Sequence, residues 1–250
     1  LVGDSFTQGA CVNRPNDIPS IFRILSNKSV LNLGSENNGP LLEYASLREY
    51  LNSNVKKVIW IYYEGNDLKN LHVEINEKIL MNYINDLTFT QNLKLKQSEI
   101  NDLAINIIKK KRNKIGEKKK KKEIFKKKLI NFISFSKTRV SIFPPPPPKL
   151  IPEFKKILEL TKDLTNKNNS KLYFVYLPAY YRYKDNNYKA NYDLIKKTIN
   201  ELNIPFIDIH KEVFEKEKNP LRFFPFEQAA HYNVEGYKKI SEIIYKFTKD

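Results

Sequence analysis

Ser5 and His231 have the side chains and the surroundings of a nucleophile and the base that activates it. Ser5 stands in Gly3-Asp4-Ser5-Phe6-Thr7, directly after a short apolar run. A serine hydroxyl attacks a carbonyl carbon once a base takes its proton, and a tight turn after a strand would expose it. His231 precedes a helical pattern near the other end of the sequence, whereas His72 lies at a polar helix start and His210 at a strand end. The pair predicts acyl-transfer chemistry.

Three further groups could donate hydrogen bonds to the oxyanion that such chemistry creates. They are the backbone N–H of Ser5, the side-chain amide of Asn66 in Glu-Gly-Asn-Asp, and a backbone N–H in the loop 34–39. One donor of this kind typically stabilises a transition state by about 3 kcal/mol. Each segment taken alone is equally compatible with an ordinary turn, because Gly, Asn, Asp and Ser are common turn residues.

The rest of the sequence alternates short apolar strands with amphipathic helices. Near-continuous apolar runs predict strands over 1–3, 29–33, 57–63, 171–177 and 205–209. Helical patterns start near Asp17, at Pro40 and at Asn233, and cover 153–166 and 188–202. This alternation predicts a doubly wound α/β domain, a flavodoxin-like three-layer sandwich with a five-stranded parallel sheet. Ligands bind beyond the carboxyl ends of such strands, which is where the residues named above fall.

Together these features resemble the SGNH/GDSL hydrolase family, named for a Ser, a Gly, an Asn and a His in that order along the chain. The resemblance implies an ester-cleaving serine enzyme with Ser5 as nucleophile, His231 as general base and Asn66 as an oxyanion donor. In the loop after Asn32-Leu33-Gly34, Asn37 takes the position of the family's Gly, and Gly39 follows two residues later. Asn tolerates left-handed backbone angles better than most residues, so the loop can keep its shape.

Two further departures from the family pattern concern Glu64 and Gln228. Glu64 stands where the family motif Gly-x-Asn-Asp has its first Gly. Gln228 stands three residues before the His, where the family has an Asp that orients the imidazole, and Glu227 is one step away. We therefore expect a Ser5–His231 dyad whose imidazole is oriented by Glu227 or by a backbone carbonyl.

Residues 89–149 interrupt the α/β pattern and divide the expected hydrolase domain into 1–88 and 150–250. The insertion has a helical stretch over 98–108, several Lys runs and five prolines over 144–148, which predict a helical arm with a polyproline spacer. Residues 94–139 hold 17 Lys and Arg against four acidic residues, so they carry thirteen of the sixteen net positive charges of the chain. An anionic membrane surface is the expected partner of this arm. Nucleic acid is a weaker expectation, because stacking aromatics and a recognisable module are missing.

The expected substrate is an acyl ester, and a surface carbohydrate is favoured as its carrier. Tyr180 and Arg182 follow the fourth strand in a Tyr-Tyr-Arg-Tyr cluster that could line a sugar subsite. The function is therefore expected to be that of a carbohydrate esterase or O-acyltransferase. A glycan-binding protein without turnover, and a nucleic-acid-binding protein that uses the basic arm, are the alternatives. No cofactor or metal is expected, because one Cys and three scattered His make no credible ligand set.

The compartment stays open. The sequence begins at Leu1, inside the first apolar run, and we expect part of the first strand to precede it. A bacterial, periplasmic or membrane-associated location would follow if an upstream anchor exists. The sequence itself holds no run of 18 apolar residues.

Overall fold

The computed structural model describes residues 1–118, 149–185, 188 and 191–249. The chain divides into two compact units, Leu1–Thr90 with Pro147–Asp250, and Gln91–Pro146. Each unit is described by itself below.

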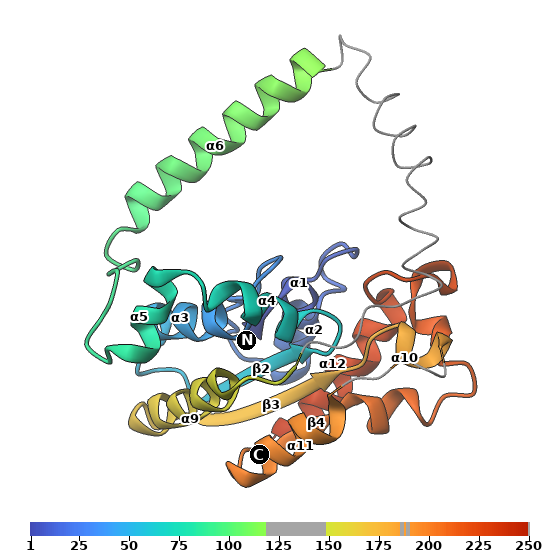
Figure 1. Ribbon diagram of the computed structural model, residues 1–250. Helices are drawn as coiled ribbons and strands as arrows, with labels where there is room; N and C mark the ends of the chain where they lie inside the picture. The colour runs from blue at the N-terminus through green and yellow to red at the C-terminus, as the bar shows by residue number, and fades with distance from the viewer. Residues whose placement is uncertain (119–148, 186–187, 189–190, 250) are drawn as a thin grey trace. The chain divides into compact units, whose positions relative to one another are not determined.

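The larger unit is built on a parallel sheet of four strands in the order β1-β2-β3-β4 (Figure 1). The strands are β1 (Val2–Gly3), β2 (Lys57–Tyr63), β3 (Lys171–Leu177) and β4 (Phe206–Asp208). All three pairs are parallel, and β2 and β3 pair along their whole length, from Lys57 with Lys171 to Tyr63 with Leu177. The predicted α/β class and parallel sheet are therefore confirmed.

The prediction of a fifth strand over 29–33 is wrong, although this segment does lie against β1. The Leu1 ammonium donates to the Leu31 carbonyl at 2.7 Å, the Leu33 N–H donates to the Leu1 carbonyl at 2.9 Å, and the Ser35 N–H donates to the Gly3 carbonyl at 3.3 Å. These bonds follow the alternation of a parallel ladder. Because β1 has only two residues, the ladder is too short for a regular strand.

Five helices cover one face of the sheet. They are α3 (Pro40–Tyr50), α4 (Asp67–Glu74), α5 (Lys78–Asn85), α9 (Pro152–Lys167) and α11 (Tyr192–Glu201). Their apolar side chains pack with Trp60, Tyr62, Phe174 and Tyr176, which alternate along β2 and β3. Successive side chains of a strand point to opposite faces, so the residues between these four point to the second face of the sheet.

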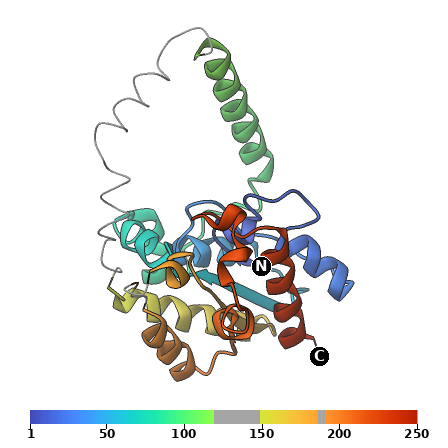
Figure 2. The same ribbon diagram turned by 90° about the vertical axis from the view of Figure 1, so that its right-hand side faces the viewer.

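The second face is covered by α1 (Ser5–Gln8), α2 (Ile18–Ser26) and α12 (Val234–Thr248), with α2 packed beside α12 (Figure 2). These helices meet the intervening strand residues Ile59, Ile61, Tyr173 and Val175. The remaining short elements are α10 (Tyr181–Lys184), the π-helix η1 (His210–Phe214), and the 3₁₀ turns η2 (Pro220–Phe223) and η3 (Pro225–Glu227). Helices on both faces bury the sheet, as its apolar strands predict.

Two of the predicted helix starts, at Asp17 and Asn233, are confirmed by capping contacts. The Asp17 carboxylate accepts the Ser20 N–H at 2.7 Å at the start of α2, and the Asn233 side chain accepts the Gly236 N–H at 3.0 Å at the start of α12. Such caps satisfy N–H groups that have no partner within the helix. The helix predicted from residue 188 begins at Tyr192 instead.

In the smaller unit, α6 (Gln97–Lys118) contains the predicted helical stretch over 98–108 and continues through residues 109–111, the first run of lysines. Leu103, Ile107 and Ile108 of α6 are exposed to 61%, 45% and 50%. The later Lys runs and the five prolines lie outside the described residues. None of the described helices is both long and apolar enough to cross a bilayer.

Candidate active site

Ser5 begins helix α1, directly after β1, at the carboxyl end of the sheet. The Asp4 carboxylate caps this helix by accepting the Phe6 N–H at 2.8 Å. Gly3 is required before the turn, because a Cβ there would lie 2.1 Å from Thr7 Oγ1 and 2.6 Å from the Ile61 carbonyl oxygen. The Gly-Asp-Ser sequence therefore has a local reason: Gly3 allows the close approach, Asp4 caps the helix, and Ser5 occupies its first position.

The structure brings His231 to Ser5 across 226 positions of sequence, with 2.8 Å between Ser5 Oγ and His231 Nε2. His231 lies between the η3 turn and α12, and its ring packs against Phe6 with ring centroids 4.5 Å apart. Burial lowers the pKa of His231, and the Glu36 carboxylate opposes this shift weakly. A neutral imidazole with its proton on Nδ1 can accept the Ser5 proton at Nε2.

The other ring nitrogen of His231 faces a cysteine, with 3.4 Å between Nδ1 and Cys11 Sγ. Glu227, predicted to help orient the ring, lies elsewhere: its Oε1 accepts the Asn219 side-chain amide at 2.8 Å. Phe226 and Glu227 have left-handed backbone angles, with φ of 54° and 51°. Cys11 was missed in the sequence, because nothing in its neighbourhood connects it with a histidine 220 positions away.

The predicted oxyanion donors have different surroundings. Asn37 is exposed and adopts the left-handed conformation expected of it, with φ of 66°. Gly39 is buried, and its N–H donates to Glu74 Oε1 at 2.6 Å, so this group is already used. Asn66 precedes α4, and its side chain hydrogen bonds to Asp4. Asn66 therefore lies next to the Ser5 turn, and its oxyanion role stays a prediction along with those of Ser5 and Asn37.

A group of buried carboxyls lies beneath the Ser5 turn. Asp4, Glu43 and Asp67 are completely buried, and Glu74 is nearly so. Burial raises the pKa of Asp4 to about 6. Burial also raises the pKa values of Glu43 and Asp67 well above the ordinary range, and repulsion from the neighbouring carboxylates adds to these two shifts. Asp67 also accepts the Tyr63 N–H at 2.8 Å. Asp4 and Asp67 thus hold the turns that carry Ser5 and Asn66, as their sequence positions suggest.

Comparison with known proteins gives a likeness in fold. No family model and no curated protein matches the sequence. Among solved structures, a protein assigned to the G-D-S-L family of lipolytic proteins, from Desulfitobacterium hafniense, superposes with a TM-score of 0.53. The match covers 98% of this chain and 96% of that chain, at 14% sequence identity. The chain has the SGNH/GDSL fold.

Within this SGNH/GDSL fold, Glu64 joins the ends of β2 and β3. Its side chain is 1% exposed and pairs with Arg182, whose Nη2 lies 2.5 Å from Glu64 Oε2. Glu64 Oε1 also accepts the Ala179 N–H at 2.6 Å, and the Tyr176 hydroxyl donates to Oε2. Arg182, predicted to bind substrate, is therefore held by a carboxylate that replaces a family glycine.

Tyr180, the second predicted substrate residue, is also engaged within the protein. Its ring is 8% exposed, and its hydroxyl donates to the Glu227 carbonyl at 3.0 Å. The contact joins the loop after β3 to the segment that leads to His231. Substrate binding by Tyr180 and Arg182 stays a prediction.

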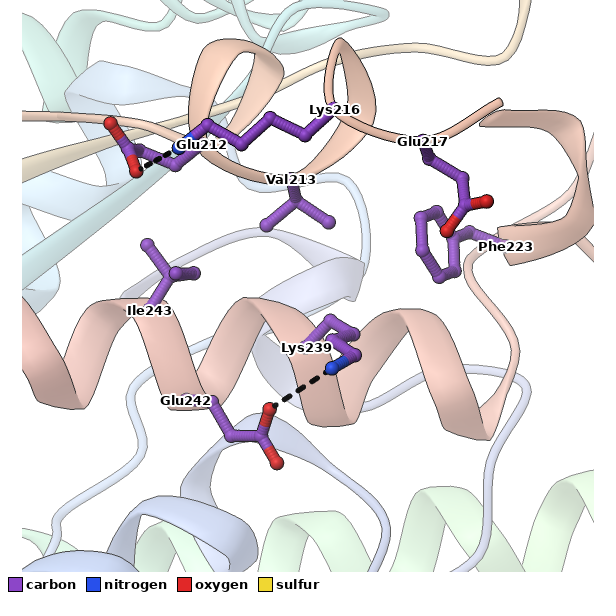
Figure 3. Close-up of a pocket in the computed structure, with 8 residues that line it drawn as sticks. All are labelled: Glu212, Val213, Lys216, Glu217, Phe223, Lys239, Glu242 and Ile243. Carbon is purple, nitrogen blue, oxygen red and sulfur yellow. Dashed lines mark hydrogen bonds and ion pairs between the residues drawn. The ribbon is translucent and has the colours of Figure 1, made fainter. Parts of the chain in front are cut away.

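Two cavities of the larger unit lie away from Ser5 and His231. One, of about 260 Å³, lies between η1 and α12, where Lys216 and Lys239 are paired with Glu212 and Glu242 (Figure 3). The other, of about 620 Å³, lies near the amino ends of the strands, against residues such as Val30 and Lys57. No cluster of His, Cys, Asp and Glu among the described residues could hold a metal ion. The Ser5–His231 pair, rather than a cavity, therefore defines the candidate site.

Proposed function

We propose that this protein is a serine esterase or O-acyltransferase that acts on an acyl ester of a surface carbohydrate through Ser5 and His231. The observation that carries the proposal is the 2.8 Å approach of Ser5 Oγ to His231 Nε2. The SGNH/GDSL fold supports it, because the two residues that meet are those that the family resemblance implies.

The reaction would begin with attack of Ser5 Oγ on the ester carbonyl carbon while the Ser5 proton moves to His231 Nε2. The carbonyl oxygen becomes an oxyanion, for which the Ser5 N–H, the Asn37 N–H and the Asn66 amide are the candidate donors. Collapse of the tetrahedral intermediate expels the alcohol, which takes the proton from His231 and leaves an acyl-serine. His231 then deprotonates water or an acceptor sugar hydroxyl, which attacks the acyl group and restores Ser5.

A carbohydrate acceptor is supported by aromatic side chains near the ends of the strands. Phe226 is 93% exposed, and Tyr181 is 42% exposed. Exposed aromatic faces are unfavourable in water and favour stacking on the apolar face of a sugar ring. They lie on η3 and α10, the two segments that Tyr180 joins.

Serine-directed labelling with a fluorophosphonate tests the proposal, together with turnover of an aryl acetate and of an acetylated oligosaccharide. Ser5→Ala and His231→Ala should each lower kcat by at least about 10³-fold, because nucleophile and base act as a unit. Ser53→Ala and His72→Ala alter residues outside the site and should match the wild type. Label retained in Ser5→Ala would overturn the proposal. A folded wild type that binds the oligosaccharide but takes no label would support the glycan-binding alternative.

A further inference from the structure

The imidazole of His231 is held on both sides, by Ser5 at Nε2 and by Cys11 at Nδ1. We propose that Cys11 is the positioning residue of His231 and takes the place that a carboxylate occupies in the SGNH/GDSL pattern. This inference rests on the proposed function, and it adds a thiol to a site for which the sequence suggested Glu227 or a backbone carbonyl.

The turn that carries Cys11 is fixed by both halves of the site. The Ala10 N–H donates to the Ser5 carbonyl at 3.0 Å, and the Ala10 carbonyl accepts the Tyr237 hydroxyl at 3.1 Å. Tyr237 belongs to α12, the helix that follows His231. Cys11 is thus anchored to the helix of the nucleophile and to the helix behind the base, so its sulfur has a defined place relative to the imidazole.

Cys11 also has a left-handed backbone conformation, with φ of 68°. This conformation is uncommon for residues other than Gly, Asn and Asp, and costs of order 1 kcal/mol or more. Because the anchored turn holds Cys11 in it, the conformation is imposed by the surroundings, and its result is the Sγ···Nδ1 contact of 3.4 Å.

The contact between Cys11 Sγ and His231 Nδ1 matters because His231 gains and loses a proton during the reaction. Before attack, the proton of the neutral ring must be on Nδ1 so that Nε2 can accept the Ser5 proton. Cys11 Sγ accepts a hydrogen bond from Nδ1–H and so favours this tautomer and this ring orientation. When Nε2 gains the Ser5 proton, the ring is a cation, and the Nδ1–H···S bond strengthens because its donor is charged. The proton stays on Nδ1 throughout.

No carboxylate takes this role in the described part of the chain. The Glu227 side chain is bonded to Asn219, and Gln228 is neutral. Glu36, from the segment between α2 and α3, favours the charged ring only through space, and burial outweighs it. The groups that face the His231 nitrogens are therefore Ser5 and Cys11, with Glu36 as the nearby charge.

Three substitutions at Cys11 separate positioning from a structural role, because Asp and Asn have the same shape and both tolerate the left-handed conformation. Cys11→Ala should lower kcat about tenfold with little change in KM, because the lost bond acts on the base and not on the substrate. Cys11→Asn should keep most of kcat. Cys11→Asp should restore or raise kcat and move the acid limb of the kcat/KM profile to higher pH, because a carboxylate favours the imidazolium.

Modification of the wild type gives a second readout that does not depend on a variant folding. Cys11 is exposed and is the only cysteine of the chain. Methyl methanethiosulfonate should convert it to a methyl disulfide, with release of methanesulfinate, and lower activity until dithiothreitol restores the thiol. Cys11→Asn should be insensitive to the reagent.

The outcomes distinguish this inference from the proposed function. A wild type whose Ser5 takes no fluorophosphonate label contradicts the proposed function and this inference with it. Labelling of Ser5 combined with a wild-type kcat in Cys11→Ala contradicts the positioning role alone. An acid limb at the same pH in the Asp and Asn variants also contradicts it.

Discussion

Half-burial of the His231 ring decides the pH range in which this residue can act as a base. Loss of water around the ring disfavours its charged form, which lowers the pKa of His231 below the ordinary value. The neutral form, which the mechanism needs, therefore persists to lower pH than in an exposed histidine.

We expect the acid limb of the kcat/KM profile of an aryl acetate to have its midpoint below about 6.5, the ordinary histidine pKa. Activity falls as the pH drops through the His231 pKa, because the protonated ring cannot accept the Ser5 proton. Glu36→Gln should move this limb slightly further down, because Glu36 is the carboxylate that favours the charged ring. A midpoint above the ordinary histidine value would contradict the assignment of His231 as a half-buried base.

A single residue could be placed correctly from the sequence where its neighbours along the chain determine its position. Ser5 and His231 were predicted from their places after a strand and before a helix together with the family resemblance, and the structure places their side chains in contact. Cys11 and Glu227 could not be assigned, because their positions depend on left-handed turns at residues 9–11 and 226–227, and short propensity patterns do not specify such turns. The pairing of Arg182 with Glu64 could not be predicted, because the two residues are 118 positions apart.

The ion pair of Glu64 and Arg182 connects strand β2 to the short helix α10. Glu64→Gln leaves the Arg182 guanidinium largely buried without its carboxylate, and breaking such a pair costs about 3 kcal/mol. We expect urea denaturation to show this loss of unfolding free energy. The matched substitution Glu201→Gln breaks the exposed pair with Lys155 and should change the urea midpoint much less. Equal effects of the two substitutions would show that Glu64 is not a buried structural partner.

Helix α6 is the described element whose surface suits an anionic membrane. Leu103 and Ile107 are one turn apart and exposed, and four basic residues follow directly over 109–112. We expect the full chain to sediment with vesicles that contain phosphatidylglycerol and much less with pure phosphatidylcholine, and salt should weaken the binding.

A substitution in α6, compared with one on another helix, tests whether α6 is the element that binds the vesicles. Ile107→Asn should reduce vesicle binding, and Ile24→Asn, on a helix of the larger unit with 69% exposure, should not. Equal binding to both vesicle types would contradict the expectation. Binding of the chain to an oligonucleotide of random sequence, without binding to vesicles, would favour nucleic acid as the partner of the basic arm.

At the scale of elements, the sequence predicted β2 and β3 to the residue, because seven-residue apolar runs buried on both faces leave no ambiguity. It gave no bounds for α4 and α5, since eight residues hold too little periodicity to separate a helix from a loop. The segment 29–33 has strand-like composition, and the structure assigns it to no strand.

Across the whole larger unit, the buried carboxyls couple folding to pH. Their pKa values are raised in the folded state, so the folded chain holds protons that the unfolded chain releases. This contribution to stability is complete below the unfolded pKa of about 4 and is lost as the pH rises; for Asp4 the loss is complete near its folded pKa of about 6.

Glu43→Gln should therefore flatten the pH dependence of the unfolding free energy. A neutral amide replaces a carboxyl that is completely buried. The difference between pH 4.5 and pH 7.5, measured by urea denaturation, should shrink by roughly 1–3 kcal/mol. Glu77→Gln changes an exposed carboxylate and should leave the dependence as it is. An unchanged pH dependence in Glu43→Gln would contradict the raised pKa of Glu43.

The separation of Ser5 from His231 along the chain has a consequence for biosynthesis. A ribosome makes the serine first and the histidine 226 residues later, after every strand of the sheet has been translated. Under the proposed function, a growing or prematurely ended polypeptide thus carries the nucleophile without its base. Hydrolytic capacity would arise only when the final helix docks, and it would be the first property lost if that helix detached.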